Sequence, residues 1–163
     1  MPEKVDFKPE QYHTITPQLI CKNATKAIEF YTRVFGATDV RVMKGPNDAV
    51  MHAELTIGDS LIFVGDSMMG KTQYADAGAA APTYLHIYVQ DVDDIVSKFV
   101  AEGSTVDAPV QDMFWGDRWG KLTDPFGQQW GIATHKEDVS GEEMNKRMKA
   151  MFGGQGASAG ASD

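Results

Sequence analysis

The sequence has almost no cysteine and no long apolar run. Cys21 is the one cysteine among 163 residues, so the chain cannot form an internal disulfide, and a cross-linked secreted fold is excluded. We expect Cys21 to be a small buried residue rather than a reactive thiol. No stretch approaches the roughly 20 apolar residues of a membrane span, and residues 1–10 lack the apolar run of a signal peptide. We therefore expect a cytoplasmic protein without a membrane partner.

Positive charge is also scarce. The chain has 15 lysines and arginines against 23 acidic residues, which gives a formal net charge of −8. A nucleic-acid partner is not expected, because such proteins normally carry a basic patch. The length fits one domain, and an apolar content of 42% is ordinary for a globular protein with a real core.

What the chain does have is an internal repeat, with an offset of 67 to 69 residues. Segment 19–28 aligns with 87–96, and in each a strand-like run ends in Asn23 or Asp91 before a helix-like run begins. Asn and Asp are favoured helix N-caps, because the side-chain oxygen accepts a backbone N–H of the first turn. Residues 54–56 then align with 121–123, and Gly58 with Gly127. The shared order of elements predicts two tandem βαβββ modules.

Hydrophobic periodicity places the elements. In the first copy it predicts a helix over 24–34, ended by Gly36, and strands at residues 15–22, 38–44, 49–57 and 60–65. In the second copy it predicts a helix over 92–102, ended by Gly103, and strands at residues 84–90, 104–111, 114–123 and 128–134. Ser140 and Glu143 form a capping box that opens a predicted amphipathic helix over 140–151.

These elements define an α+β fold, in which two modules form a curved, mostly antiparallel sheet with helices on its outer face. The predicted division of the chain is an N-terminal arm 1–12, a first module 13–66, a linker 67–82, a second module 83–135, a C-terminal helix 136–152 and a disordered tail 153–163.

The tandem modules and several local motifs resemble the vicinal-oxygen-chelate superfamily, which includes glyoxalase I, bleomycin-resistance proteins and extradiol dioxygenases. The motifs are most similar to its PhnB-like branch. They are Ala27-Ile28-Glu29-Phe30-Tyr31, Phe35-Gly36-Ala37, Met51-His52-Ala53-Glu54-Leu55, Leu85-His86-Ile87-Tyr88-Val89, Asp91-Val92-Asp93, Gly116-Asp117-Arg118, Asp124-Pro125-Phe126-Gly127 and His135-Lys136-Glu137-Asp138-Val139. The resemblance covers about residues 15–149, and it implies helices on one face of the sheet and a ligand site on the other.

Alternation along each strand then sorts side chains between these two faces. The apolar sets, such as Ala53, Leu55 and Ile57, are expected to meet the helices. The opposite sets are expected to line a cleft between the modules and to bind a ligand. The candidate ligand-binding residues are Gln18, His52, Glu54, Tyr84, His86, Tyr88, Trp119 and Lys121. Aromatic rings with a few polar groups are typical of a small-molecule pocket.

The resemblance also raises the question of a metal. In metal-dependent members of the superfamily, a His or Gln early in the first strand of each module and a Glu late in its last strand hold the ion. In this chain those positions fall on Thr16, Tyr84, Ile62 or Phe63, and Gly131, which are poor metal ligands. If a metal is present, Glu54 and His86 are the candidate ligands. Otherwise Glu54 hydrogen-bonds a histidine or pairs with Lys121.

Two functions follow from this pattern. The first is a protein that binds a planar or hydrophobic small molecule without a catalytic metal or other cofactor, as drug-resistance members of the superfamily do. The alternative is a glyoxalase-type lyase, isomerase or dioxygenase with a divalent metal such as Ni, Zn, Fe or Mn, in which Glu54 and His86 are the catalytic candidates. The resemblance implies a homodimer, and the cleft belongs either to one chain or to two.

Two further residues of the second module are not expected to bind a ligand. Arg118 is interpreted as a partner of a nearby acid, such as Asp117 or Asp124, rather than as a clamp for a ligand anion. His135 is interpreted as solvated, because it lies in a charged run.

Overall fold

The structure is a computed structural model that describes residues 8–67 and 83–153. Most of the predicted linker and the predicted tail therefore lie outside the described residues. Within these two ranges, no helix is long and apolar enough to cross a membrane.

The first module has the predicted order of elements. It contains β1 (Gln18–Cys21), α1 (Ala24–Phe35), β2 (Thr38–Lys44), a 3₁₀ turn η1 (Pro46–Asp48), β3 (Val50–Ile57) and β4 (Ser60–Asp66). The strands form one four-stranded sheet in the order β1-β4-β3-β2. β1 runs parallel to β4, and the other neighbours are antiparallel.

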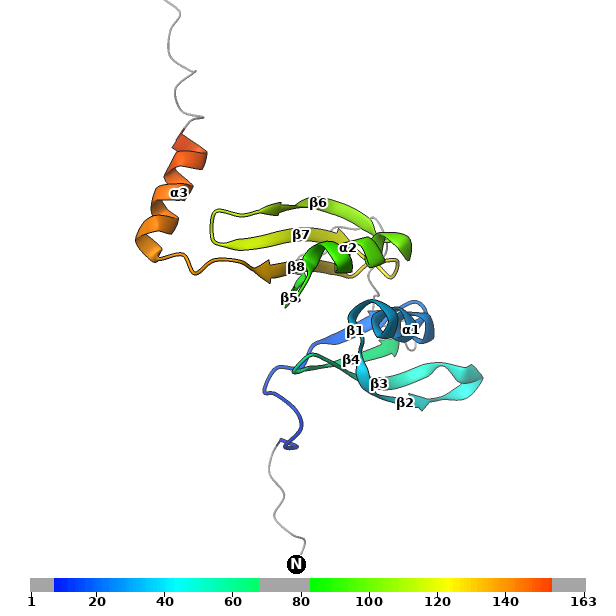
Figure 1. The fold of residues 1–163 in the computed structure, drawn as a ribbon. Helices are drawn as coiled ribbons and strands as arrows, with labels where there is room; N and C mark the ends of the chain where they lie inside the picture. Colours follow the sequence, from blue (N-terminus) through cyan, green and yellow to red (C-terminus); the bar gives the residue numbers. More distant parts are fainter. Residues whose placement is uncertain (1–7, 68–82, 154–163) are drawn as a thin grey trace, which may run out of the picture.

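The second module repeats this arrangement. It contains β5 (Leu85–Tyr88), α2 (Val92–Ala101), β6 (Thr105–Asp112), β7 (Asp117–Thr123) and β8 (Gln129–His135), with the sheet order β5-β8-β7-β6. A third helix, α3 (Gly141–Gly153), follows and lies beyond the end of this sheet (Figure 1). The predicted α+β fold of two tandem βαβββ modules is confirmed, with each module contributing its own sheet.

The caps predicted from the sequence begin the helices. The Asn23 side chain accepts a hydrogen bond from the Lys26 N–H at 3.0 Å, and Asp91 accepts one from Asp94 at 3.0 Å. Ser140 caps α3 by accepting from the Glu143 N–H at 3.2 Å. Each side chain satisfies an N–H that has no partner within its helix.

Two strands begin three residues later than predicted, and each has a local cause. β1 begins at Gln18 rather than at residue 15, because Pro17 has no N–H to continue the ladder and offers only its carbonyl, which accepts from Phe63 at 2.8 Å. β7 begins at Asp117 rather than at 114. Residues 113–116 form a tight turn, closed by a hydrogen bond from the Gly116 N–H to the Met113 carbonyl.

The two modules share one core, which lies between their helices. α1 and α2 lie between the two sheets (Figure 1), and their aromatic residues interlock. The Phe30 and Phe99 rings meet edge to face at 5.1 Å, and the Phe35 ring lies 4.8 Å from Trp130. Both sheets therefore turn their helix-covered faces toward the middle of the molecule and their open faces outward.

Candidate functional site

The open face of the first sheet carries a cluster around one carboxylate. We call this surface the Glu54 face, and it consists of Gln18, Ile20, His52, Glu54, Thr56 and Phe63. Period-two alternation places these side chains opposite the buried residues Ala53, Leu55 and Val64. The ladder sets Gln18 beside Phe63 and Phe63 beside Glu54, so these three residues cross the sheet in one row.

Glu54 is held by two donors, one of which comes from outside the sheet. The Tyr12 hydroxyl donates to Glu54 Oε1 at 2.5 Å, and His52 Nε2 lies 3.4 Å from the same oxygen. The hydrogen bond from Tyr12 is the main reason that the pKa of Glu54 is lowered, and the same bond raises the pKa of Tyr12. Glu54 is thus an ionised acceptor at neutral pH.

The N-terminal segment covers part of this face. The Tyr12 ring packs edge to face on Phe63 at 5.4 Å, and Lys8 Nζ donates to the Tyr12 carbonyl. A small cavity of about 230 Å³ remains beside it, lined by Gln11, His13, Asp39, Arg41, Glu54, Thr56, Asp59 and Leu61. A small polar group fits this space and would meet both signs of charge.

The open face of the second sheet is largely aromatic. We call it the aromatic face, and it consists of Tyr84, His86, Tyr88, Trp119 and Lys121, with Gly131 and Ala133 on the strand between them. The ladder places Tyr88, Ala133 and Trp119 in one row across the sheet, and His86, Gly131 and Lys121 in the next. Gly131 and Ala133 on β8 thus lie between large side chains on either side of this strand, and we call these two rows of large side chains the walls.

The side chains on both walls lean inward over Gly131. A Cβ at this position would lie 2.8 Å from Tyr84, 3.0 Å from Trp119 Nε1 and 3.2 Å from His86 Nδ1. Glycine is therefore what allows these side chains, from two different strands, to converge. Lys121 Nζ lies 5.0 Å from the centre of the Tyr84 ring, which is a cation–π distance.

Asp117 fixes one end of the aromatic face. This buried carboxylate accepts from the Tyr88 hydroxyl and from Trp115 Nε1, both at 3.1 Å, and lies 2.8 Å from His135 Nδ1. The hydrogen bond to Asp117 raises the pKa of Tyr88. Asp117 therefore sets the orientation of two aromatic side chains through their polar ends.

The interpretation of His135 as merely solvated is wrong. Although half of this side chain is exposed, its ring lies between Asp117 and Asp138, with Nε2 3.0 Å from Asp138. These two acidic partners, Asp117 first, raise its pKa. A charged run in a sequence does not reveal that a buried acid from another strand faces it.

Arg118 is a partner of acids, as expected, but the acids are different ones. It forms a two-bond pair with Asp93 at 2.7 and 2.8 Å and a further bond with Asp112 at 3.2 Å. Neither predicted partner, Asp117 or Asp124, is involved, because each accepts hydrogen bonds from other donors. Arg118 thus ties β7 to α2.

The expectation of one cleft between the modules, lined by all candidate residues, does not hold within a single chain, which leaves the two-chain alternative. The Glu54 face and the aromatic face belong to different sheets whose helices are packed together, so the two faces look in opposite directions. The predicted Glu54–Lys121 pair is also wrong, because Glu54 bonds Tyr12 while Lys121 lies over Tyr84.

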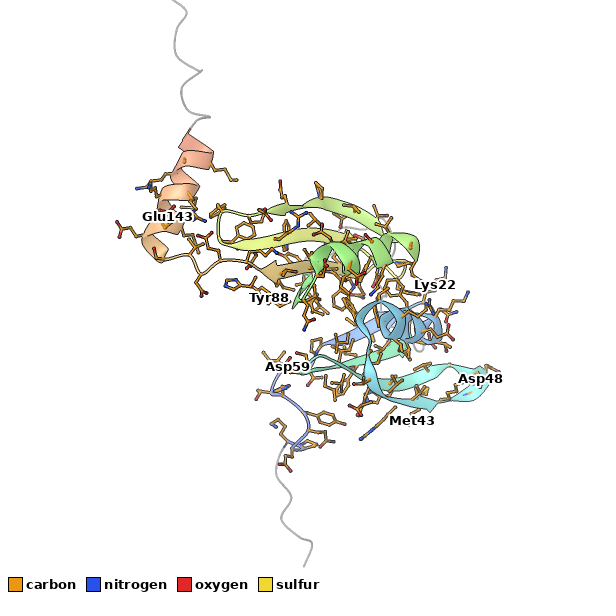
Figure 2. All side chains as sticks on the ribbon, in the orientation of Figure 1. Lys22, Met43, Asp48, Asp59, Tyr88 and Glu143 are labelled. Atoms are coloured by element: carbon orange, nitrogen blue, oxygen red, sulfur yellow. The ribbon has the colours of Figure 1, made fainter. Side chains whose placement is uncertain are left out.

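A pocket of about 920 Å³ does lie between the modules, but most of the residues that line it are not candidate residues. Only His86 and Tyr88 among the candidate residues border it, and Tyr88 and Asp59 mark its two sides (Figure 2). Its remaining lining is Pro17, Phe35, Ile57, Gly58, Ser60, Ile62, Leu85, Ile87, Val89, Gln90, Asp91, Asp94, Ile95 and Trp130. Most of these are residues of the helix-covered side.

The residues do not fit a metal centre within one chain. Among residues 8–67 and 83–153, no group of three or more His, Cys, Asp or Glu side chains is placed to hold an ion. Glu54 Oε1 is already hydrogen-bonded by Tyr12, and His86 lies on the other sheet. At Gly131, one of the positions that the resemblance assigns to a ligand, three neighbouring side chains fill the space.

Sequence reasoning missed four residues that shape these faces. Tyr12 precedes the first strand and carries no periodic signal, and Phe63 was considered only as a metal position. Trp115 lies in the turn before β7, where alternation has no meaning, and Asp117 is the first residue of that strand. The run Trp115-Gly116-Asp117-Arg118 was the available signal, because its polar aromatic and charged residues need partners.

The chain is similar in sequence to known proteins. Residues 12–132 match the family described as the glyoxalase/bleomycin resistance protein/dioxygenase superfamily. An uncharacterised protein of Mycobacterium tuberculosis (strain ATCC 25618 / H37Rv) is 29% identical over 144 residues, which cover 86% of this chain and 85% of the relative.

Solved structures show the same fold. A crystal structure of a protein from Pseudomonas aeruginosa superposes with a TM-score of 0.63 at 24% identity and covers 77% of this chain and 100% of its own. The PhnB protein from Bacillus cereus has a TM-score of 0.57 at 19% identity, covering 75% of this chain and 99% of its own. At these identities the likeness supports the fold alone.

Proposed function

Since the chain belongs to the glyoxalase/bleomycin resistance protein/dioxygenase superfamily, we propose that it binds a planar or hydrophobic small molecule between the Glu54 face of one chain and the aromatic face of a second copy. The chain then acts as a homodimer, and binding needs no resident metal. This function requires neither nucleic acid nor a membrane.

The observation that carries this proposal is the exposed aromatic area on the open face of the second sheet. Tyr84 is 48% exposed and Tyr88 62% exposed, although their neighbours Trp119 and His86 lean toward the same spot. Burying apolar area is favourable by about 25 cal/mol per Å². A flat ligand that covers these rings therefore gains both burial and stacking.

A second copy is proposed because one chain cannot close the site. The interlocked aromatic residues of α1 and α2 leave the Glu54 face and the aromatic face on opposite outer sides. A two-fold dimer can set the Glu54 face of each chain against the aromatic face of its partner and so create two equivalent clefts. Strands β1 and β5 lie at sheet edges and are available to border the partner.

In this arrangement each residue has a physical role. Trp119, Tyr84 and Tyr88 provide flat apolar surface, and Phe63 provides an apolar wall from the opposite chain. Glu54 supplies an ionised acceptor for a donor group of the ligand, held in place by Tyr12.

The metal part of the proposal is tested by elemental analysis of protein purified without an affinity tag or chelator. We expect no stoichiometric Ni, Zn, Fe or Mn, even after soaking with excess ion. One ion per chain, lost in both Glu54→Ala and His86→Ala, would contradict the metal-free function. It would instead favour the metal-dependent lyase, isomerase or dioxygenase, with these two residues as ligands.

The binding part is tested by titration with Nile red, a neutral planar dye. We expect saturable binding that Trp119→Leu weakens by about tenfold, because leucine removes the flat ring but keeps apolar volume. Val106→Ala is the control, because Val106 is 42% exposed and lies on the other side of the same sheet. Equal affinity in the wild type and in Trp119→Leu would contradict the proposal.

A further inference from the structure

The aromatic face has more hydrogen-bond donors than acceptors. Tyr88 and Trp115 donate to Asp117. Trp119 Nε1, by contrast, has no acceptor among residues 8–67 and 83–153, and it points toward the space above Gly131. Lys121 adds an ammonium group on the same side of the sheet, over the Tyr84 ring.

Lys121 differs from the other half-buried basic residues. Arg118 and Arg147 are each paired with two carboxylates, and Lys8 donates to a backbone carbonyl. Within the part of the chain that the structure describes, Lys121 has neither kind of acceptor, only the face of an aromatic ring. The Lys121 ammonium is therefore available to donate hydrogen bonds to an anionic group of a ligand.

This arrangement is notable in a chain of net charge −8. Acidic residues outnumber basic ones by 23 to 15 across the chain. On the aromatic face the balance is reversed, because Trp119, Lys121 and the hydroxyl of Tyr84 all offer donors. The nearby carboxylate, Asp117, is buried and already accepts hydrogen bonds.

We propose that the aromatic face recognises a planar aromatic anion, such as an aromatic carboxylate. The ring lies against Trp119 and the tyrosines, and the charged oxygens accept hydrogen bonds from Lys121 Nζ and Trp119 Nε1. This inference rests on the proposed function and adds the charge of its ligand. Hydrogen bonds to a charged acceptor are about twice as strong as neutral ones, which is why the anionic group is selected.

The test compares two probes that share a ring and differ in charge, 2-naphthoate and 2-naphthamide, by isothermal titration calorimetry at pH 7.5. We expect wild-type protein to bind naphthoate about tenfold more tightly than naphthamide. In Lys121→Gln this preference should fall to about twofold or less, and Trp119→Phe, which keeps a ring but loses the N–H, should reduce it in part.

Lys98→Gln is the matched control, because it removes the same charge from an exposed ion pair on α2. It should keep the wild-type preference, and unchanged circular dichroism should show that all variants are folded. Equal wild-type affinity for both probes would overturn the anion inference but leave the proposed binding function standing. A preference that survives Lys121→Gln, or a failure of both probes to bind, would also overturn it, and Nile red then reports separately on the proposed function.

Discussion

At residue 124 a single buried carboxylate joins the two modules. Asp124 accepts from Tyr31 of α1 at 2.8 Å, from Trp130 at 3.0 Å, and from the backbone N–H groups of Phe126 and Gln128, both at 2.9 Å. The sequence marked it as part of a motif and as a candidate partner of Arg118, not as a link to the first module. Its second role depends on a tyrosine that lies 93 residues away.

We predict that Asp124→Ala lowers the free energy of unfolding by about 3 kcal/mol, because two buried and two part-buried donors lose their acceptor. Urea denaturation measures this change. Asp112→Ala is the control, because Asp112 is 78% exposed and its bond to Arg118 lies at the surface. That variant should change stability by about 0.5 kcal/mol or less. Equal effects of the two substitutions would show that Asp124 does not tie the modules together.

The hydrogen bond from the Tyr12 hydroxyl leads to a separate prediction about how stability depends on pH. It donates to ionised Glu54, so the folded-state pKa of Glu54 lies below its unfolded value. The stabilisation is therefore present above the unfolded pKa of about 4.3 and is lost as pH falls through the lower folded pKa. In Tyr12→Phe the pKa of Glu54 should rise toward its ordinary value.

Carbon-13 NMR of the Glu54 carboxyl measures that pKa in both proteins. The stability difference between wild type and Tyr12→Phe should be largest near neutral pH and shrink in acid. A Glu54 pKa that does not move would mean that the Tyr12 hydrogen bond does not form in solution. The phenylalanine ring keeps the contact with Phe63, so packing is held constant.

At the scale of elements, sequence reasoning succeeded where the signal is local. Asn23, Asp91 and Ser140 were identified as caps because a cap acts on the N–H groups two or three residues ahead. Inward residues such as Leu55 and Cys21 followed from period two, and both are fully buried. The starts of β1 and β7 were missed, because a proline and a tight turn interrupt otherwise strand-like runs.

We predict that Asn23→Ala and Asp91→Ala each cost about 1 kcal/mol of stability, and that the double variant costs about the sum. Thermal and urea unfolding of the three variants measure these values. Lys26→Ala is the control for α1, because only its backbone N–H takes part in the cap. A loss in Lys26→Ala as large as that in Asn23→Ala would contradict the capping account.

At the scale of the whole molecule, the internal repeat predicted two modules but not how they pack. Each sheet has a helix-covered face and an open face, and alternation sorts residues equally well whichever faces meet. The deciding contacts, such as Phe30 on Phe99 and Phe35 on Trp130, join residues that no local pattern connects. For this reason the sequence assigned the candidate residues to open faces but left open whether one chain or two form the cleft.

The central claim, that each site combines faces from two chains, is tested by mixed dimers. Phe63→Ala damages the Glu54 face, and Trp119→Leu damages the aromatic face. In a dimer of either variant alone, each of the two sites contains one damaged face. A mixed dimer, isolated with two different tags, has one site that carries both lesions and one site with neither.

Nile red stoichiometry in that mixed dimer is the most direct measurement. The account predicts that it recovers about half of the wild-type binding, with wild-type affinity at the recovered site. Binding no better than in either parent variant would place both faces in a single-chain site and contradict the account, and a chain that stays monomeric in sedimentation would do the same.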